Sequence, residues 1–221
     1  MKQLIDNYFT DHYATCFAAL CNSKVQITEE KTAEVWFDLQ DVPPYISAKG
    51  RGNASFRNPQ GHDISVLGYD DYITKLPGKF GTGRQRCDFI IEDKVSKIIV
   101  LDEMTSSDNH KNIIKPIKKR KNGDIKYQGG KLEKAREQLF ATLQTLCEVK
   151  EINCSLQKYD KKICLCSCKL CSSKVKPIDR TLAAFNRGVK MTDGMKKSNQ
   201  EIEAFGFEYR LLIHPNAFAL S

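Results

Sequence analysis

Two neighbouring stretches, RCDFII at residues 86–91 and KIIVLDEMT at residues 97–105, decide how this chain is expected to fold. The second stretch is continuously aliphatic from Ile98 to Leu101, without the alternation of a strand that has one face in water. That pattern predicts a central β-strand covered on both faces. The short connection at residues 92–94 predicts that the two stretches form an antiparallel hairpin.

Each of the two predicted strands carries a carboxylate. Asp88 directly precedes an apolar run, and Glu103 lies near the end of the aliphatic strand. A buried carboxylate without a partner is costly, so two acids on neighbouring core strands need a common compensating charge. Mg²⁺ or Mn²⁺ is suited to that position because these ions prefer oxygen ligands, and such an ion can polarise a phosphate and activate water. A plainer alternative stays open, in which both acids simply meet solvent at the strand ends.

Helices are expected on both sides of the hairpin. Apolar residues recur at helical spacing over residues 2–21, and a strong amphipathic pattern runs from Lys131 to Glu148. The Gly-, Asn- and Pro-rich stretch at residues 47–85 is expected to be a long irregular region with only short ordered pieces. Towards the end of the chain the sequence predicts helices at residues 180–186 and 193–205 and a strand at residues 207–213.

An N-terminal helix, an Asp-bearing strand, an acid-bearing strand and then a helix with Lys and Gln residues resemble the PD-(D/E)XK nuclease superfamily. The resemblance covers roughly residues 86–147 and, more loosely, the N-terminal helix. It implies an α/β (α+β) fold with a central mixed sheet flanked by helices, as in restriction endonucleases. It also implies that Asp88 and Glu103 hold a divalent metal, and that the protein hydrolyses phosphodiester bonds, in DNA in preference to RNA.

The sequence departs from the family pattern at the third motif position, where Thr105 stands in place of Lys. A register shifted by one residue would instead place Met104 there. In this superfamily the Lys can migrate to the following helix, so Lys131 and Lys134 are candidates, and Gln138 resembles the Gln that some members carry. If nothing replaces the Lys, the resemblance implies a weak or inactive metal site. The competing hypothesis is therefore a catalytically silent, zinc-stabilised subunit that binds nucleic acid or protein.

The positive charge of the chain comes from one segment. The net charge is +8, and residues 111–136 contain ten basic and two acidic residues, so the remainder is neutral overall. A concentrated positive charge attracts phosphate backbones, although a solvated loop is the plainer alternative. The expected nucleic-acid contacts are Lys115, Lys118, Lys119, Arg120, Lys121 and Lys126.

Cysteines cluster near residue 170. Of the nine cysteines, Cys164, Cys166, Cys168 and Cys171 fall within eight residues. A hairpin over residues 153–176 would let four thiolates bind a structural zinc ion in the manner of a zinc knuckle, with Cys147 or Cys154 able to replace one of them. Buried reduced thiols and a redox or metal-handling role are the alternatives.

The length of 221 residues predicts a single domain, with residues 153–176 as a Cys-rich insert. No apolar run is long enough to span a bilayer, and the N-terminal residues lack the features of a secretory signal. We therefore expect a cytoplasmic protein without a membrane partner, whose cysteines stay reduced. The sequence leaves open a homo-oligomer or a subunit of a larger complex.

Overall fold

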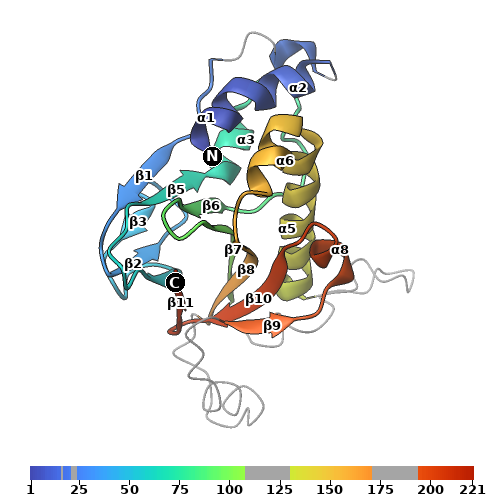
Figure 1. Ribbon diagram of the computed structural model, residues 1–221. Helices are drawn as coiled ribbons and strands as arrows, with labels where there is room; N and C mark the ends of the chain where they lie inside the picture. The colour runs from blue at the N-terminus through green and yellow to red at the C-terminus, as the bar shows by residue number, and fades with distance from the viewer. Residues whose placement is uncertain (16, 21–23, 108–129, 171–193) are drawn as a thin grey trace, which may run out of the picture.

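The structure is a computed structural model, and it describes residues 1–15, 17–20, 24–107, 130–170 and 194–221. Its centre is a seven-stranded mixed sheet with the strand order β1-β5-β6-β7-β8-β10-β9 (Figure 1). The strands are β1 (Glu29–Thr32), β5 (Ile64–Gly68), β6 (Phe89–Asp93), β7 (Ile98–Ser107), β8 (Lys161–Leu170), β9 (Met195–Lys197) and β10 (Glu208–Ile213). The expected central mixed sheet flanked by helices is thus confirmed.

The hairpin that decides the fold is present. Strands β6 and β7 pair antiparallel, with Phe89 opposite Asp102 and Asp93 opposite Ile98. Strand β7 lies inside the sheet because β8 pairs with its other edge in parallel. Its aliphatic residues are buried on both faces, as the unbroken apolar run predicted, since Ile99 and Leu101 belong to one core cluster and Ile98 and Val100 to another.

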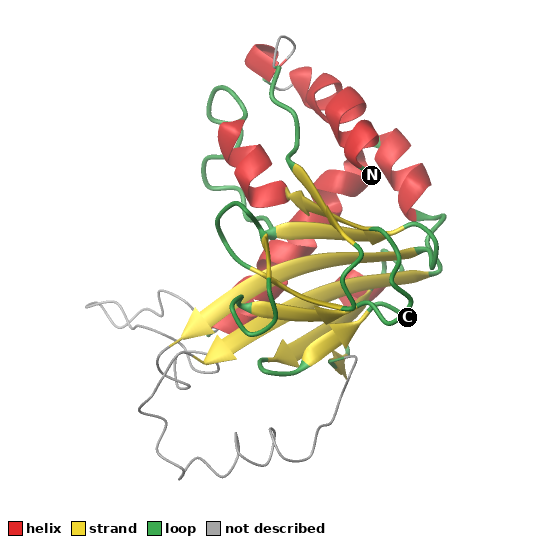
Figure 2. Cartoon of the chain, turned by 90° about the vertical axis from the view of Figure 1, so that its left-hand side faces the viewer, coloured by secondary structure: helices red, strands yellow, loops and turns green. Residues whose placement is uncertain are grey.

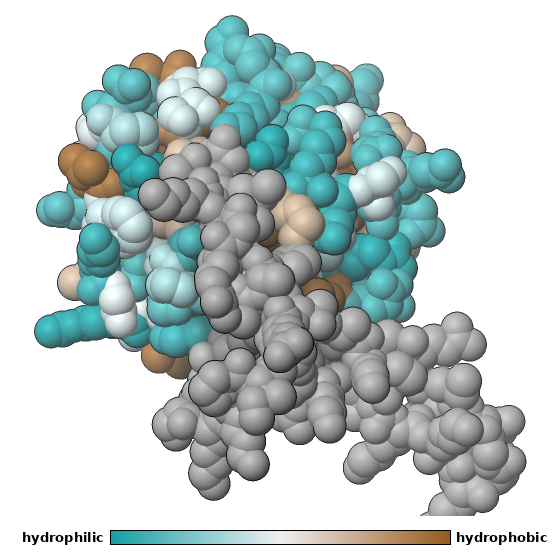
Figure 3. Space-filling model, turned by 90° about the horizontal axis from the view of Figure 1, so that it is seen from below, coloured by the Kyte–Doolittle hydropathy of each residue, from teal (hydrophilic) through white to brown (hydrophobic). Residues whose placement is uncertain are grey.

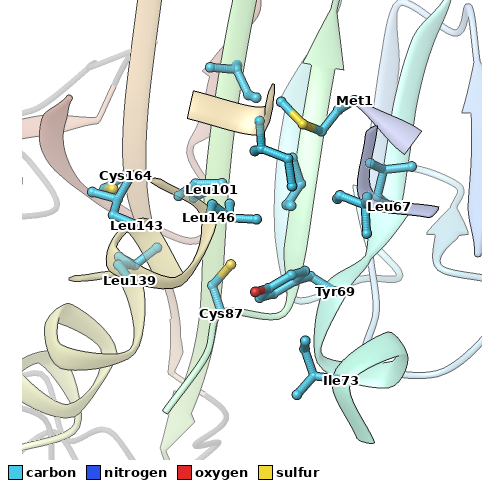
Figure 4. Close-up of a cluster of buried hydrophobic side chains, with 14 of the residues drawn as sticks. Met1, Leu67, Tyr69, Ile73, Cys87, Leu101, Leu139, Leu143, Leu146 and Cys164 are labelled. Carbon is cyan, nitrogen blue, oxygen red and sulfur yellow. The ribbon is translucent and has the colours of Figure 1, made fainter. Parts of the chain in front are cut away.

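One face of the sheet is covered by helices (Figure 2). Helix α5 (Lys131–Glu148) connects β7 to β8 through α6 (Lys150–Leu156), as parallel neighbouring strands require. Figure 4 shows Leu139, Leu143 and Leu146 of α5 beside Leu101 and Cys164 of the sheet, and all five side chains are fully buried. The predicted helix at residues 131–148 is therefore confirmed with the expected bounds.

The N-terminal segment joins the same helical layer. It comprises α1 (Lys2–Leu4), the π-helical turn η1 (Ile5–Phe9), α2 (Thr10–Ala14) and the short 3₁₀ turn η2 (Ala18–Leu20). The predicted helix at residues 2–21 is thus helical over most of its length but not one regular α-helix. Its apolar residues pack against α3 (Tyr69–Lys75), where the Phe9 ring lies 5.7 Å from the Tyr72 ring.

A small second sheet covers the opposite face. Its strand order is β11-β4-β2-β3, formed by β2 (Trp36–Leu39), β3 (Ile46–Ser47), β4 (Ala54–Arg57) and β11 (Ala217–Ala219). The stretch at residues 47–85 was expected to hold only short ordered pieces, at residues 64–67 and 72–73; β5 and α3 lie at those positions, whereas β4 was not predicted. Strand β4 is only four residues long, and its pairing partners lie elsewhere in the chain, so local sequence carries little signal for it.

Two further predictions need correction. Residues 193–205 do not form one helix, because β9 pairs with β10 and only α8 (Gln200–Glu203) is helical, with Asn199 capping its first turn. The described part of the Cys-rich segment is not a hairpin either, since residues 153–156 end α6 and residues 161–170 form the single strand β8. Pairing with β7 on one edge and β10 on the other fixes β8 as an interior strand. The predicted helix at residues 180–186 lies outside the described residues.

The surface seen from below is mainly hydrophilic where its residues are described, with small scattered apolar spots (Figure 3). Large exposed apolar side chains of the described residues are Tyr8, Val35, Val42 and Val95. No helix within the described ranges has the length and apolar character needed to cross a membrane.

Candidate functional site

The two carboxylates singled out by the sequence meet at one end of the β6–β7 hairpin. The backbone N–H of Asp88 donates to Asp102 O at 3.1 Å, and the N–H of Met104 donates to Asp88 Oδ2 at 2.7 Å. These two bonds fix Asp88, the residue that precedes β6, to β7 beside Glu103. Glu103 lies two residues beyond Leu101 and shares its face of the sheet, the face covered by α5. The hairpin thus brings the predicted acids together.

Both acids are held in an environment that disfavours their charge. Burial, together with the charges of Asp88 and Asp102, raises the pKa of Glu103 to about 10. Burial is also the main reason that the pKa of Asp88 is raised to about 7, although its hydrogen bond from Met104 opposes the shift. Glu103 is only 6% exposed, and its Oε2 atom has no hydrogen-bond partner among the described residues. A nearby positive charge would offset this cost.

Lys134 is the cation that the structure brings to this pair. Its charge lowers the pKa of both Asp88 and Glu103, although the charge of Asp102 has a larger effect on Glu103. The other candidate, Lys131, donates through Nζ to the backbone oxygen of Ser106 at the end of β7. Of the two candidates for the missing motif Lys, Lys134 is thus the one whose charge is among the main influences on both carboxylates.

Gln138 and Thr105 occupy supporting positions. Gln138 lies one turn after Lys134 on α5, and its Nε2 donates to Arg86 O at 2.9 Å, which ties the helix to the segment that carries Asp88. Thr105 follows Glu103 by two residues, so its side chain leaves β7 on the same face. The motif position occupied by Thr105 is therefore directed towards the acid pair, but it contributes no charge.

The register shifted by one residue would make Asp102 the second motif acid. Asp102 instead lies on the opposite face of β7, fully buried, where its Oδ1 accepts from Ser167 Oγ at 2.6 Å. Burial raises the pKa of Asp102 to about 8. The alternation of side chains along β7 thus directs Glu103, and not Asp102, towards Asp88 and Lys134.

Two further acids near the site were missed by the sequence reasoning. Asp70 begins α3 and pairs through Oδ1 with Arg86 Nε at 2.6 Å, and Asp41 accepts from Asn53 Nδ2 at 3.3 Å. The negative charge of each raises the pKa of Asp88. Neither acid belongs to a recognisable sequence motif. Asp41 follows β2 and Asp70 lies in the first turn of α3, and only tertiary packing brings their charges to this end of the sheet. The local potential is therefore negative, which favours a cation.

The expected metal ligands form only a partial set. Within the described part of the chain, no group of three or more His, Cys, Asp or Glu side chains is placed to hold a metal ion. Cys164, Cys166 and Cys168 share one buried face of β8, as alternation predicts. However, four residues along a strand span about 13 Å, too far for Cys164 and Cys168 to bind one zinc ion directly. Cys171 lies outside the described residues.

The expected nucleic-acid contacts also fall outside the described residues: Lys115, Lys118, Lys119, Arg120, Lys121 and Lys126 all lie between residues 108 and 129. In the chain, that segment follows β7 and precedes α5. Comparison with models of protein families, with curated proteins and with solved structures finds no match for this chain. The case for a function therefore rests on the geometry of the site.

The raised pKa values predict an unusual dependence of stability on pH. Between the ordinary pKa of a carboxyl group and its raised value, the folded state holds more protons than the unfolded state, so the free energy of unfolding falls as pH rises. We expect urea unfolding in EDTA to show a loss of order 2 kcal/mol between pH 5 and pH 8. The Asp88→Asn, Glu103→Gln variant should lose much of this dependence. The exposed Asp63→Asn variant should retain it, and a double variant that follows the wild-type pH profile would contradict the prediction.

Proposed function

We propose that this protein is a divalent-metal-dependent nuclease that hydrolyses phosphodiester bonds, in DNA in preference to RNA, with a divergent PD-(D/E)XK site. One observation carries the proposal: Asp88 and Glu103 meet at the end of a central hairpin with strongly raised pKa values, beside Lys134. The chain order of N-terminal helix, Asp-bearing strand, acid-bearing strand and helix with Lys and Gln also supports the resemblance to that superfamily.

The residues present fit a single hard cation. Asp88 and Glu103 would provide oxygen ligands on one side of the cation. Glu103 Oε2 has no hydrogen-bond partner among the described residues, so a cation would displace none there. Mg²⁺ commonly takes only one or two protein carboxylates and fills its other positions with water and phosphate oxygens. A bound Mg²⁺ or Mn²⁺ would supply Lewis-acid activation of the phosphate and of water.

The side chains around the acid pair would have separate tasks. Asp88 and Glu103 would position the cation, and Glu103 would have to release its proton when the cation binds. The Lys134 ammonium would stabilise the negative charge that develops on the phosphoryl oxygens. Gln138 would hold α5 against the Asp88 segment through its bond to Arg86 O. The direct test is incubation of linear DNA and RNA with Mg²⁺ or Mn²⁺, with EDTA as the control.

The second candidate function is the silent, zinc-stabilised binding subunit. The observation that favours it is Thr105, which leaves β7 without the charge that the motif normally carries. Salt-sensitive nucleic-acid binding without cleavage under any divalent cation would support this function over the nuclease.

A basic loop beside the acid pair provides a further contact for a phosphate backbone. Residues 48–53 are held by Asp38, whose Oδ2 accepts from the N–H groups of Gly50 and Gly52 at 2.6 and 3.1 Å. Asn53 at its end donates to Asp41, one of the acids that act on Asp88. The loop carries the exposed side chains of Lys49 and Arg51, and Lys49 Nζ lies 4.0 Å from the centre of the Trp36 ring.

We expect Lys49→Glu combined with Arg51→Glu to weaken DNA binding by about tenfold or more. The slope of the logarithm of the binding constant against the logarithm of salt concentration should fall by about two, because about two fewer counterions are released on binding. Fluorescence anisotropy with Ca²⁺ in place of Mg²⁺ measures this binding. The exposed pair Lys24→Glu and Lys150→Glu provides the same charge change elsewhere on the molecule. Equal weakening in both double variants would show that only the net charge matters and not this loop.

A further inference from the structure

A cavity of about 880 Å³ lies at the end of the central sheet opposite to the acid pair. Its walls come from the start of the N-terminal helical segment, β1, the β6–β7 turn and the end of α6. The register of the hairpin separates the two sites, because Lys97 at the cavity precedes β7 whereas Glu103 lies six residues further along it. That separation corresponds to about 20 Å of strand.

The cavity wall is rich in ammonium groups. Among the described residues, the carboxylates that line it are Glu29 and Glu92. Its lysines come from four separate elements of the fold: Lys2, Lys31, Lys94, Lys97 and Lys158. A concave surface with one predominant sign of charge attracts and concentrates ligands of the opposite sign.

The two carboxylates do not neutralise this charge. Glu92 is buried and already accepts from the Tyr159 hydroxyl and from the Met1 amino group, whose nitrogen lies 3.0 Å away. The pairs that two lysines make with these carboxylates are long, at 4.0 Å for Lys31 with Glu29 and 3.9 Å for Lys94 with Glu92. Lys2 and Lys97 pair instead with Asp6 and Asp160, which do not line the cavity. The ammonium groups of Lys31 and Lys94 are exposed and only weakly held, so they remain available to an anion.

An exposed aromatic ring completes the wall. Tyr8 is 41% exposed, whereas the neighbouring Phe9 is fully buried. The π-helical turn η1 separates the two side chains, and Tyr8 lines the cavity together with Asn7. A half-exposed tyrosine beside lysines provides a stacking surface for a nucleobase next to contacts for phosphates.

We propose that this cavity binds a phosphorylated nucleoside, with the base on Tyr8 and two or more phosphates on the lysines. The volume lies within the range of small-molecule sites. The inference is independent of the proposed nuclease function, because it uses none of the residues of the acid pair. The same chemistry occurs in a free nucleotide and in the 5′-phosphorylated end of a nucleic-acid strand, and the experiment must separate these two sources.

The test is isothermal titration calorimetry on the full chain in EDTA, which prevents metal-dependent chemistry at the acid pair. The ligands are ATP, pyrophosphate, adenosine and a 5′-phosphorylated single-stranded oligonucleotide. We expect ATP to bind more tightly than pyrophosphate or adenosine. Lys94→Glu with Lys158→Glu should weaken ATP binding at least tenfold, and Tyr8→Ala should weaken ATP but leave pyrophosphate unchanged. The control pair Lys24→Glu and Lys150→Glu should bind ATP like the wild type.

The outcomes are decisive in either direction. Tighter binding of the oligonucleotide than of ATP, lost in the same variants, would assign the site to a strand end. Pyrophosphate binding as tightly as ATP would overturn the assignment to a nucleoside. Absence of ATP and oligonucleotide binding at millimolar ligand, or equal weakening in the control pair, would overturn the site itself. Lys94 and Lys158 are exposed, so their variants should fold, and thermal unfolding checks this directly.

Discussion

The Asp88→Asn, Glu103→Gln variant should lose cleavage activity by about a thousandfold or more while becoming more stable than the wild type at pH 8. The loss follows because neutral amides do not replace two carboxylates as ligands for Mg²⁺. The gain in stability follows because the pKa values of Asp88 and Glu103 are raised to about 7 and about 10, so their charged forms destabilise the folded state. Cleavage of linear DNA and urea unfolding in EDTA measure the two effects.

Asp102→Asn is the matched control for this variant. Asp102 is adjacent in sequence and equally buried, but it faces the other side of β7 and bonds to Ser167. Its variant should retain cleavage. Loss of activity in Asp102→Asn with full activity in Glu103→Gln would show that the shifted motif register is correct and that our assignment of the acids is wrong.

Lys134→Ala should reduce cleavage by about a hundredfold, because the ammonium beside the acid pair would no longer stabilise developing negative charge. Adding Thr105→Lys to this variant should recover about tenfold or more of the lost rate, since residue 105 lies on the Glu103 face of β7 and a lysine there would reach the same site from the strand. Initial rates at saturating Mg²⁺ separate this effect from weaker metal binding.

Lys131→Ala is the control on the same helix. Lys131 donates to the Ser106 backbone, and its charge is not among the main influences on either carboxylate. We expect a small reduction in rate for this variant. A greater loss in Lys131→Ala than in Lys134→Ala would transfer the proposed role to Lys131, and full activity in both variants would exclude a catalytic lysine on α5.

Much of the core of the site could be predicted from local sequence. The aliphatic run of β7 has no polar alternation and is mostly β-branched, which is typical of an interior strand. Its central position and its hairpin with β6 could therefore be predicted. Helix α5 could be predicted because its leucines recur at helical spacing. The juxtaposition of Asp88 and Glu103 then required only that the hairpin form.

The surroundings of the acids could not be predicted in the same way. The short strand β4 is stabilised by partners outside its own polar, glycine-rich stretch, so that stretch looked irregular. The Cys-rich segment looked like a hairpin, yet pairing on both edges makes β8 an interior strand. Asp41 and Asp70 carry no motif, and only packing brings their charges near Asp88.

The sequence by itself determined the central hairpin, its two acids and the helix that covers them, because the apolar patterns that predict these elements lie in continuous local stretches of the chain. Only the tertiary structure decided that the charge of Lys134 acts on both acids, that Asp102 bonds to Ser167, and that lysines from four parts of the fold line one cavity with Tyr8. The physical reason is that electrostatic interactions depend on distances in space, and those distances are set by non-local strand pairing and helix packing.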